Sequence, residues 1–137
     1  MVIVDDHLAL MAVAGALPDL EVSGPVVTTY SFQHRMARAV ADSARAGSLS
    51  RRLTDPPAAL RRVLHPPAHR LVVLDPRTSI EEAVHVAIGH RANLLLAELV
   101  GAALHHRAFV RVAPGNQGKT WAELMETEGV DFATVEP

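Results

Sequence analysis

Two aspartates follow the first apolar run of the chain, Val2-Ile3-Val4-Asp5-Asp6. Three β-branched residues in succession predict a short strand that is buried on both faces, as in a parallel sheet. In open α/β sheets, functional groups gather at the carboxyl ends of the strands. Asp5 and Asp6 are therefore the first candidates for any acid-dependent chemistry of this chain.

A further acid, Glu98, lies in the middle of the most apolar helical segment, which spans residues 92–106. This segment has almost no polar face, so it is expected to be central in the fold. A carboxylate is rarely buried without a partner. Two interpretations of Glu98 stay open: a structural one, with a salt bridge to an arginine or a less buried helix, and a functional one, in which Glu98 faces an acidic site.

Strand and helix patterns alternate along the chain. Apolar runs predict five strands, at residues 2–4, 26–29, 71–74, 109–112 and 130–135. Helical patterns separate these strands, and in one of them Ile80, Val84, Ala87 and Ile88 recur at helical spacing. Parallel strands need such crossovers, so we predict an α/β fold: three α/β/α layers with a mainly parallel central sheet of four to five strands.

Length and composition favour one folded domain over residues 1–137. Nearly half of the residues are apolar, no run approaches 18 uncharged apolar residues, and acids occupy the place of a signal peptide's basic charge. The sequence has no cysteine, which excludes disulfides, thiolate metal sites and thiol nucleophiles. The expectation is a cytoplasmic protein without a membrane segment.

The charge is unevenly distributed. Residues 35–70 hold eight arginines but only Asp42 and Asp55 as acids, whereas the net charge of the whole chain is -2. Arginine suits contacts with phosphates or carboxylates, so this segment is a candidate RNA-binding surface. A codon bias spread over solvated helix faces is the alternative. Two Pro-Pro pairs predict an irregular basic subdomain at about 48–70.

Two short motifs offer alternative functions. The opening acidic pair resembles the start of response-regulator receiver domains, in which Asp75, after its own apolar run, would be the phospho-acceptor. The segment 113–120 imitates a phosphate-binding loop that ends in Lys119 and Thr120. Both motifs are incomplete, because the receiver's later lysine and the remainder of a nucleotide-binding domain are missing.

Over nearly its full length the chain resembles the PIN domain, the fold of VapC-type toxin ribonucleases. The likeness rests on the order of a first strand ending in an aspartate, a late acid-bearing helix, a strand followed by a polar turn, and a closing strand after Gly129. The resemblance implies a Mg²⁺ or Mn²⁺ site, with Asp5 and Glu98 as catalytic residues and Asp5, Asp6, Glu98 and Asn116 as metal ligands.

The chain departs from the PIN pattern at the second acid, where it offers Gln33, His34 and Arg35. Removing charge from a magnesium site weakens metal affinity and water activation. Two hypotheses follow. The first is a metal-dependent ribonuclease of weak or lost activity, expected as the toxin of a toxin-antitoxin pair. The second is a non-catalytic PIN-like binding or regulatory module, expected as a homodimer or with an antitoxin-like protein.

Overall fold

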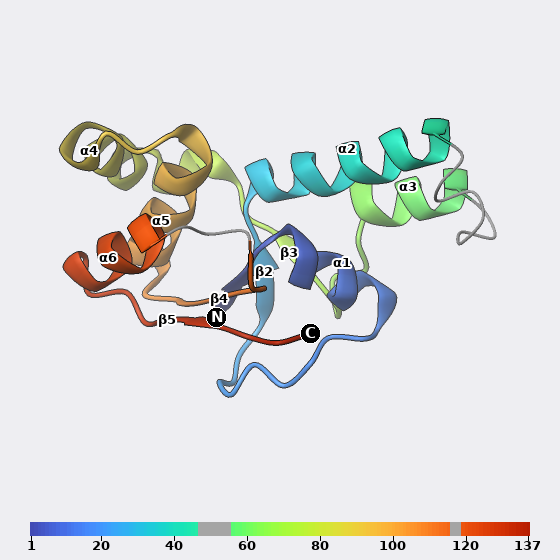
Figure 1. Cartoon of the computed structure of the whole chain (residues 1–137), viewed down its shortest axis with the longest axis horizontal. Helices are drawn as coiled ribbons and strands as arrows, with labels where there is room; N and C mark the ends of the chain where they lie inside the picture. Colours follow the sequence, from blue (N-terminus) through green and yellow to red (C-terminus); the bar gives the residue numbers. More distant parts are fainter. Residues whose placement is uncertain (47–55, 116–118) are drawn as a thin grey trace.

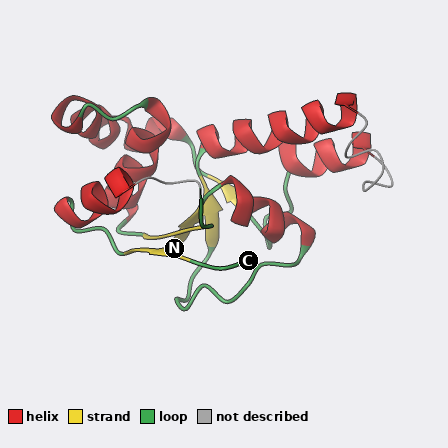
Figure 2. Ribbon diagram, viewed as in Figure 1, coloured by secondary structure: helices red, strands yellow, loops and turns green. Residues whose placement is uncertain are grey.

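A computed structural model of the chain describes residues 1–46, 56–115 and 119–137. Figure 1 shows a central sheet with helices on both of its faces, and Figure 2 separates the strands from the helices by colour. The predicted α/β class with three layers is confirmed, and all five strands are parallel. The strands are β1 (Val2–Val4), β2 (Val26–Thr28), β3 (Val72–Val73), β4 (Phe109–Val112) and β5 (Phe132–Thr134).

The strand order is β3-β2-β1-β4-β5, which places β1 at the centre of the sheet. All three residues of β1 are buried, as its β-branched sequence predicts. Parallel pairing brings the carboxyl ends of all the strands to one edge of the sheet. Asp5 therefore lies in the middle of that edge, directly after β1.

Six α-helices are present in the part of the chain that the structure describes, together with one 3₁₀ turn, η1 (Pro76–Ser79). The helices are α1 (Asp6–Ala14), α2 (Tyr30–Ala46), α3 (Pro56–Leu64), α4 (Ile80–His90), α5 (Leu94–His106) and α6 (Lys119–Thr127). Local signals set several boundaries: Asp5 caps the start of α1, Gly15 ends it with φ +75°, and Asn93 caps α5.

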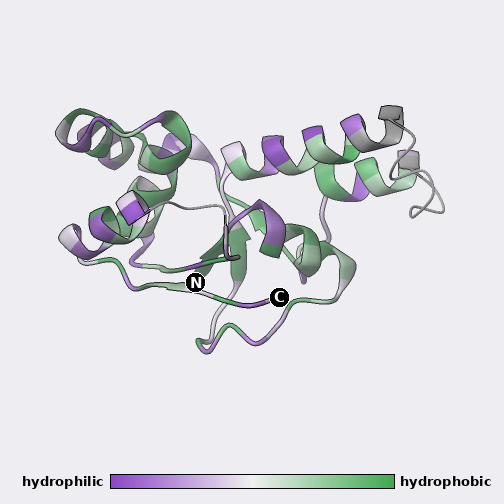
Figure 3. Ribbon diagram, viewed as in Figure 1, coloured by the Kyte–Doolittle hydropathy of each residue, from purple (hydrophilic) through white to green (hydrophobic). Residues whose placement is uncertain are grey.

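The sheet separates two apolar cores, because successive side chains of a strand point to opposite faces. Ile3 packs with the layer made by α4, α5 and α6, and Trp121 of α6 lies there as well. Val2 and Val4 pack on the other face, with α1, α2 and α3. In Figure 3 the strands are mainly green, and polar turns alternate with apolar ones along α2.

Several sequence expectations need correction in detail. The predicted buried strand at 71–74 is a two-residue edge strand, β3, with Val72 exposed. Helix α4 forms as its apolar spacing predicts, but Ile80, Val84 and Ile88 are exposed to solvent. Val86 is buried, and Ala87 packs against the core.

Part of the basic segment is a regular helix. Helix α3 packs along α2, and the side chain of Gln33 donates hydrogen bonds to the carbonyls of Val63 and Leu64 at 3.2 and 3.1 Å. The side chain of Arg70 donates a hydrogen bond to the carbonyl of Val13 at 2.7 Å. This bond holds the segment before β3 against α1. The remainder of the predicted irregular subdomain, residues 47–55, falls outside the described residues.

The helices are short or polar compared with membrane spans. Over residues 1–46, 56–115 and 119–137, no helix combines the length and the apolar run that crossing a bilayer requires.

Candidate functional site

Asp5 lies at the carboxyl end of β1, as predicted, but its side chain is fully buried. Oδ1 accepts a hydrogen bond from the backbone N–H of Leu8 at 3.0 Å, which caps α1. Oδ2 accepts one from the N–H of Ala113, just after β4, also at 3.0 Å. One carboxylate thus joins two segments that are more than 100 residues apart, because it accepts from an N–H in the first turn of α1 and from the N–H that follows β4.

Asp6 is the first residue of α1 and is more accessible than Asp5. Its Oδ2 lies 3.4 Å from Nε of Arg35 on α2. The arginine occupies part of the stretch where the PIN resemblance places a second acid. A cation therefore lies beside Asp6 in the position where a metal centre would need another carboxylate.

Glu98 is 6% exposed, and its carboxylate meets the first turn of α2. Oε1 accepts hydrogen bonds from the backbone N–H groups of Tyr30 at 2.9 Å and of Ser31 at 3.4 Å. Oε2 accepts a short hydrogen bond from the Ser31 hydroxyl. The first turn of a helix carries unpaired N–H donors and a partial positive charge, and Glu98 satisfies both from a distant helix.

Neither expectation for Glu98 describes this arrangement fully, since its partner is a helix terminus rather than an arginine. The sequence did contain a relevant signal: the first turn of α2 has no acidic residue of its own. Thr29 caps Phe32 at 3.3 Å, and the other donors of this turn need a remote acceptor. Ser31 and Glu98 are 67 residues apart, and no local pattern connects them.

A cavity of about 410 Å³ opens beside this contact, between the starts of α2 and α5. Its walls combine apolar and cationic side chains: Tyr30, Ser31, His34, Arg35, Leu94 and Leu95. The lining contains no carboxylate, so the charge that it presents to a ligand is positive or neutral. Such a cavity suits an anionic or aromatic group better than a metal ion.

The predicted metal ligands do not form a recognisable metal centre among the described residues. Within that part of the chain, no group of three or more His, Cys, Asp or Glu side chains is arranged to hold an ion. Asn116, the fourth predicted ligand, lies in the segment 116–118 outside the description. Asp5 and Glu98 are instead positioned by the N–H groups that they bind.

The residues of the two alternative motifs lie elsewhere. Strand β2 separates β1 from β3, so Asp75 follows an edge strand and does not adjoin the strand that carries Asp5. Asp75 forms a bidentate pair with Arg77, which lowers the pKa of this carboxyl to about 2. Lys119 opens α6, with Nζ 3.7 Å from Glu123. The strand order does not favour the receiver alternative.

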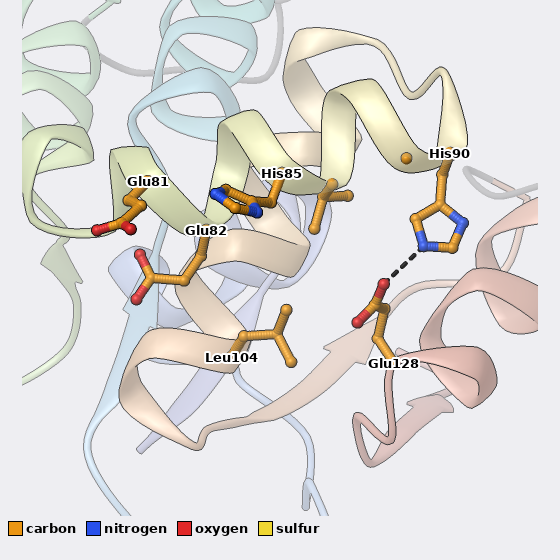
Figure 4. Close-up of a pocket in the computed structure, with 8 residues that line it drawn as sticks. Glu81, Glu82, His85, His90, Leu104 and Glu128 are labelled. Atoms are coloured by element: carbon orange, nitrogen blue, oxygen red, sulfur yellow. Dashed lines mark hydrogen bonds and ion pairs between the residues drawn. The ribbon is translucent and has the colours of Figure 1, made fainter.

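A second cavity, of about 400 Å³, lies on α4 and α5, and Figure 4 shows its lining. Nε2 of His90 is 2.6 Å from Oε1 of Glu128, which joins the end of α4 to the residue after α6. Glu82 is held 2.8 Å from Nδ1 of His105. The hydrogen bond with His105 lowers the pKa of Glu82. Sequence reasoning gave these histidines no role.

Comparison with known proteins assigns the chain to no family. The chain matches none of the models of known protein families, and a search among curated proteins finds no match. The function is therefore inferred from the chemistry of the site.

Proposed function

We propose that this chain is a PIN-like binding module that recognises RNA through its basic α2–α3 hairpin and does not hydrolyse it. The order of acid-bearing strand, late acid-bearing helix and closing strand supports the PIN-like class. The observation that carries the proposal is that the two principal acids are hydrogen-bonded to the protein itself. Asp5 and Glu98 each direct both carboxylate oxygens at protein donors and are almost completely buried.

A nuclease of this type needs carboxylate oxygens that hold hydrated Mg²⁺ or Mn²⁺ and activate water. The acids of this chain perform a different task, because they close the N-termini of α1 and α2. Arg35 beside Asp6 further opposes the collection of a dication there. The acidic positions of the PIN pattern are thus explained as structural residues that keep the fold.

The proposed RNA contact is the outer surface of α2 and α3. Arg38, Arg61 and Arg62 are exposed on these helices, and of the acids described on them only Asp42, paired with Arg38 at 3.6 Å, offsets their charge. Arginine side chains bind phosphate oxygens through paired N–H donors. The hairpin projects from the sheet in Figure 1, so a nucleic-acid strand can reach it.

A specific observation also favours a small protein partner, as expected for an antitoxin-like protein. A cavity of about 160 Å³ lies where α1, α2 and α3 meet, and it is apolar except for Arg62. Its other lining residues are Leu10, Val13, Ala14, Val40, Ala59 and Val63. An amphipathic segment with acidic residues flanking its apolar face fits this surface.

The test is the salt dependence of RNA binding, measured by anisotropy with a fluorescein-labelled single-stranded RNA. Each phosphate contact contributes roughly 0.7 to the slope of log K against log salt. Replacing Arg61 and Arg62 with alanine should reduce the slope by up to about 1.4 and weaken binding. Arg77→Ala, an exposed arginine away from the hairpin, is the matched control and should leave both unchanged.

The same RNA, incubated with Mg²⁺ or Mn²⁺, tests the nuclease alternative. We expect no metal-dependent cleavage and no heat of divalent binding in calorimetry. Cleavage that requires the metal and disappears in a folded Asp6→Asn variant would overturn the non-catalytic proposal. RNA binding that does not change with salt concentration, or with the replacement of the two arginines, would overturn the RNA proposal. The proposal of a protein partner would then remain.

A further inference from the structure

A further cavity, here named the α6 cavity, lies between the bend that joins α4 to α5 and the first turns of α6, and its volume is about 320 Å³. Apolar and polar side chains line it in equal number: Ala92, Leu96, Trp121 and Leu124 are apolar, and His90, Arg91, Asn93 and Thr120 are polar. The apolar residues are buried or half-buried and the polar ones are exposed. The cavity therefore has an apolar interior and a polar mouth.

The charge of the α6 cavity is positive. None of the described residues that line it is acidic, and Arg91 is its permanent cation. His90 also lines the cavity of Figure 4, but there the other charged residues are Glu81, Glu82 and Glu128. The α6 cavity thus favours an anionic ligand, and its neighbour does not.

The polar side chains at the mouth are hydrogen-bond donors that remain available. Within residues 1–46, 56–115 and 119–137, neither the guanidinium of Arg91 nor the hydroxyl of Thr120 has a partner. Asn93 uses its Oδ1 to accept from the N–H of Leu96 at 3.0 Å, so its NH₂ group is left to donate. Arginine, asparagine and threonine side chains are common ligands of phosphate oxygens.

Trp121 adds a buried donor to this cavity. Its side chain is only 9% exposed, and its indole N–H has no acceptor in the described part of the chain. Buried donors are nearly always paired, because an unpaired one has lost its water without replacement. An acceptor atom on an otherwise apolar ligand group would satisfy the indole N–H.

We propose that the α6 cavity binds a nucleoside monophosphate, with the base in the apolar interior and the phosphate at Arg91, Asn93 and Thr120. A heteroaromatic base combines flat apolar faces with acceptor nitrogens, so it matches both the leucines and the indole N–H of Trp121. The phosphate carries about two negative charges, which the mouth can bind. The volume lies at the lower end of the range for small-molecule sites, which suits a single nucleotide.

The proposed nucleotide site is separate from the proposed RNA contact. Figure 1 shows α4, α5 and α6 at one end of the molecule and the α2–α3 hairpin at the other. It also differs from the phosphate-binding loop that the segment 113–120 imitates. Thr120 lines the cavity, whereas Lys119 is 3.7 Å from Glu123 and is not among the described lining residues.

The fluorescence of Trp121 measures binding directly, because Trp121 is the chain's single tryptophan and lines the cavity. We expect AMP to change the emission in a saturable manner, with a dissociation constant below about 1 mM. Adenosine and inorganic phosphate, which each lack half of the ligand, should bind at least about tenfold more weakly. No change of emission and no heat of binding with AMP up to about 10 mM would overturn the proposal.

Replacement of Arg91 tests the phosphate contact, with calorimetry as the measurement. Arg91→Asn removes the cation and keeps the backbone, since φ is +52° there and asparagine tolerates this conformation. We expect AMP to bind at least about tenfold more weakly. Arg107→Asn is the matched control, because Arg107 is also exposed, has φ +51° and lines a different cavity. Equal AMP affinity of the two folded variants would overturn the proposal.

Trp121→Phe tests the interior, because it keeps an aromatic ring and removes the N–H. We expect AMP affinity to fall about three- to tenfold while the circular dichroism spectrum is retained, and an unchanged affinity would contradict the role of the indole. The double variant Arg61→Ala, Arg62→Ala should bind AMP as the wild type does, so failure of the RNA proposal and failure of this one are distinguishable. RNA binding that weakens in Arg91→Asn, together with no AMP binding by the wild type, would assign the cavity to the RNA surface and overturn the nucleotide proposal.

Discussion

Asp5 combines a position that is typical of catalytic groups with hydrogen bonds that are typical of a structural residue. A carboxylate after a central parallel strand has the position of a catalytic group, yet its oxygens bind the N–H groups of Leu8 and Ala113. The burial is complete, so the carboxylate replaces water as the acceptor for both donors. Asp5 therefore holds β1, β4 and α1 together.

At this scale we predict that Asp5→Asn lowers the free energy of unfolding by about 1–3 kcal/mol. Asparagine still caps Leu8, but its NH₂ group then faces the N–H of Ala113, donor against donor. Asp6→Asn, which weakens a partly exposed pair with Arg35, should cost at most about 1 kcal/mol. Urea denaturation of both variants gives the comparison, and equal costs would contradict the bracing role of Asp5.

Helices α4 and α5 are positioned by a glycine. A Cβ on Gly101 would lie 2.6 Å from the backbone nitrogen of Ala83 and 2.7 Å from its Cα. Backbone atoms cannot move aside as a flexible side chain does, so the two helices approach closely only because position 101 has no side chain. The outward direction of Ile80, Val84 and Ile88 on α4 depends on this contact.

We therefore predict that Gly101→Ala costs about 1–3 kcal/mol, or more if α4 shifts. Gly89→Ala is the matched control within the same helix pair, because a Cβ at Gly89 meets nothing within 4 Å. That change should stabilise the protein by up to about 1 kcal/mol through helix propensity. Thermal unfolding of the two variants should move the midpoint in opposite directions. A neutral Gly101→Ala would show that α4 and α5 are less tightly packed than described.

Across the whole molecule, two histidine–glutamate contacts link helices that are distant in sequence. His90–Glu128 and Glu82–His105 lie around the cavity of Figure 4 and connect α4 with α5 and with the end of α6. Burial, and then the charge of His105, lower the pKa of His106 below its ordinary value of 6.5. The pKa of Glu82 is likewise below its ordinary value of 4.5.

Both lowered pKa values make the unfolded chain bind protons before the folded one does, so stability should decrease as the pH falls. The decrease begins below about pH 6.5 through His106 and continues below about pH 4.5 through Glu82. His106→Asn should flatten the upper part of this dependence, and Glu82→Gln the lower part. Denaturant titrations at several pH values measure the free energy of unfolding of each variant. If both variants keep the wild-type pH dependence, His106 and Glu82 are not its origin.

The sequence by itself determined the α/β class, the strands near Val2, Val26 and Phe109, and the placement of Asp5 at the carboxyl edge. Each follows from local chemistry: β-branched runs form buried strands, and the helices that separate them force parallel pairing. The cap at Asp5 is also local, because an aspartate three residues before a helical N–H is an ordinary helix start.

Only the tertiary structure decided which partners the acids have and which side of α4 faces solvent. The contact of Glu98 with Tyr30 spans 68 residues, and that of Asp5 with Ala113 spans 108. No sequence period encodes such pairings, since they arise when separate helices meet at one sheet edge. Likewise, helical spacing shows that Ile80, Val84 and Ile88 share a face, but the close approach of Gly101 to Ala83 sets which way that face points.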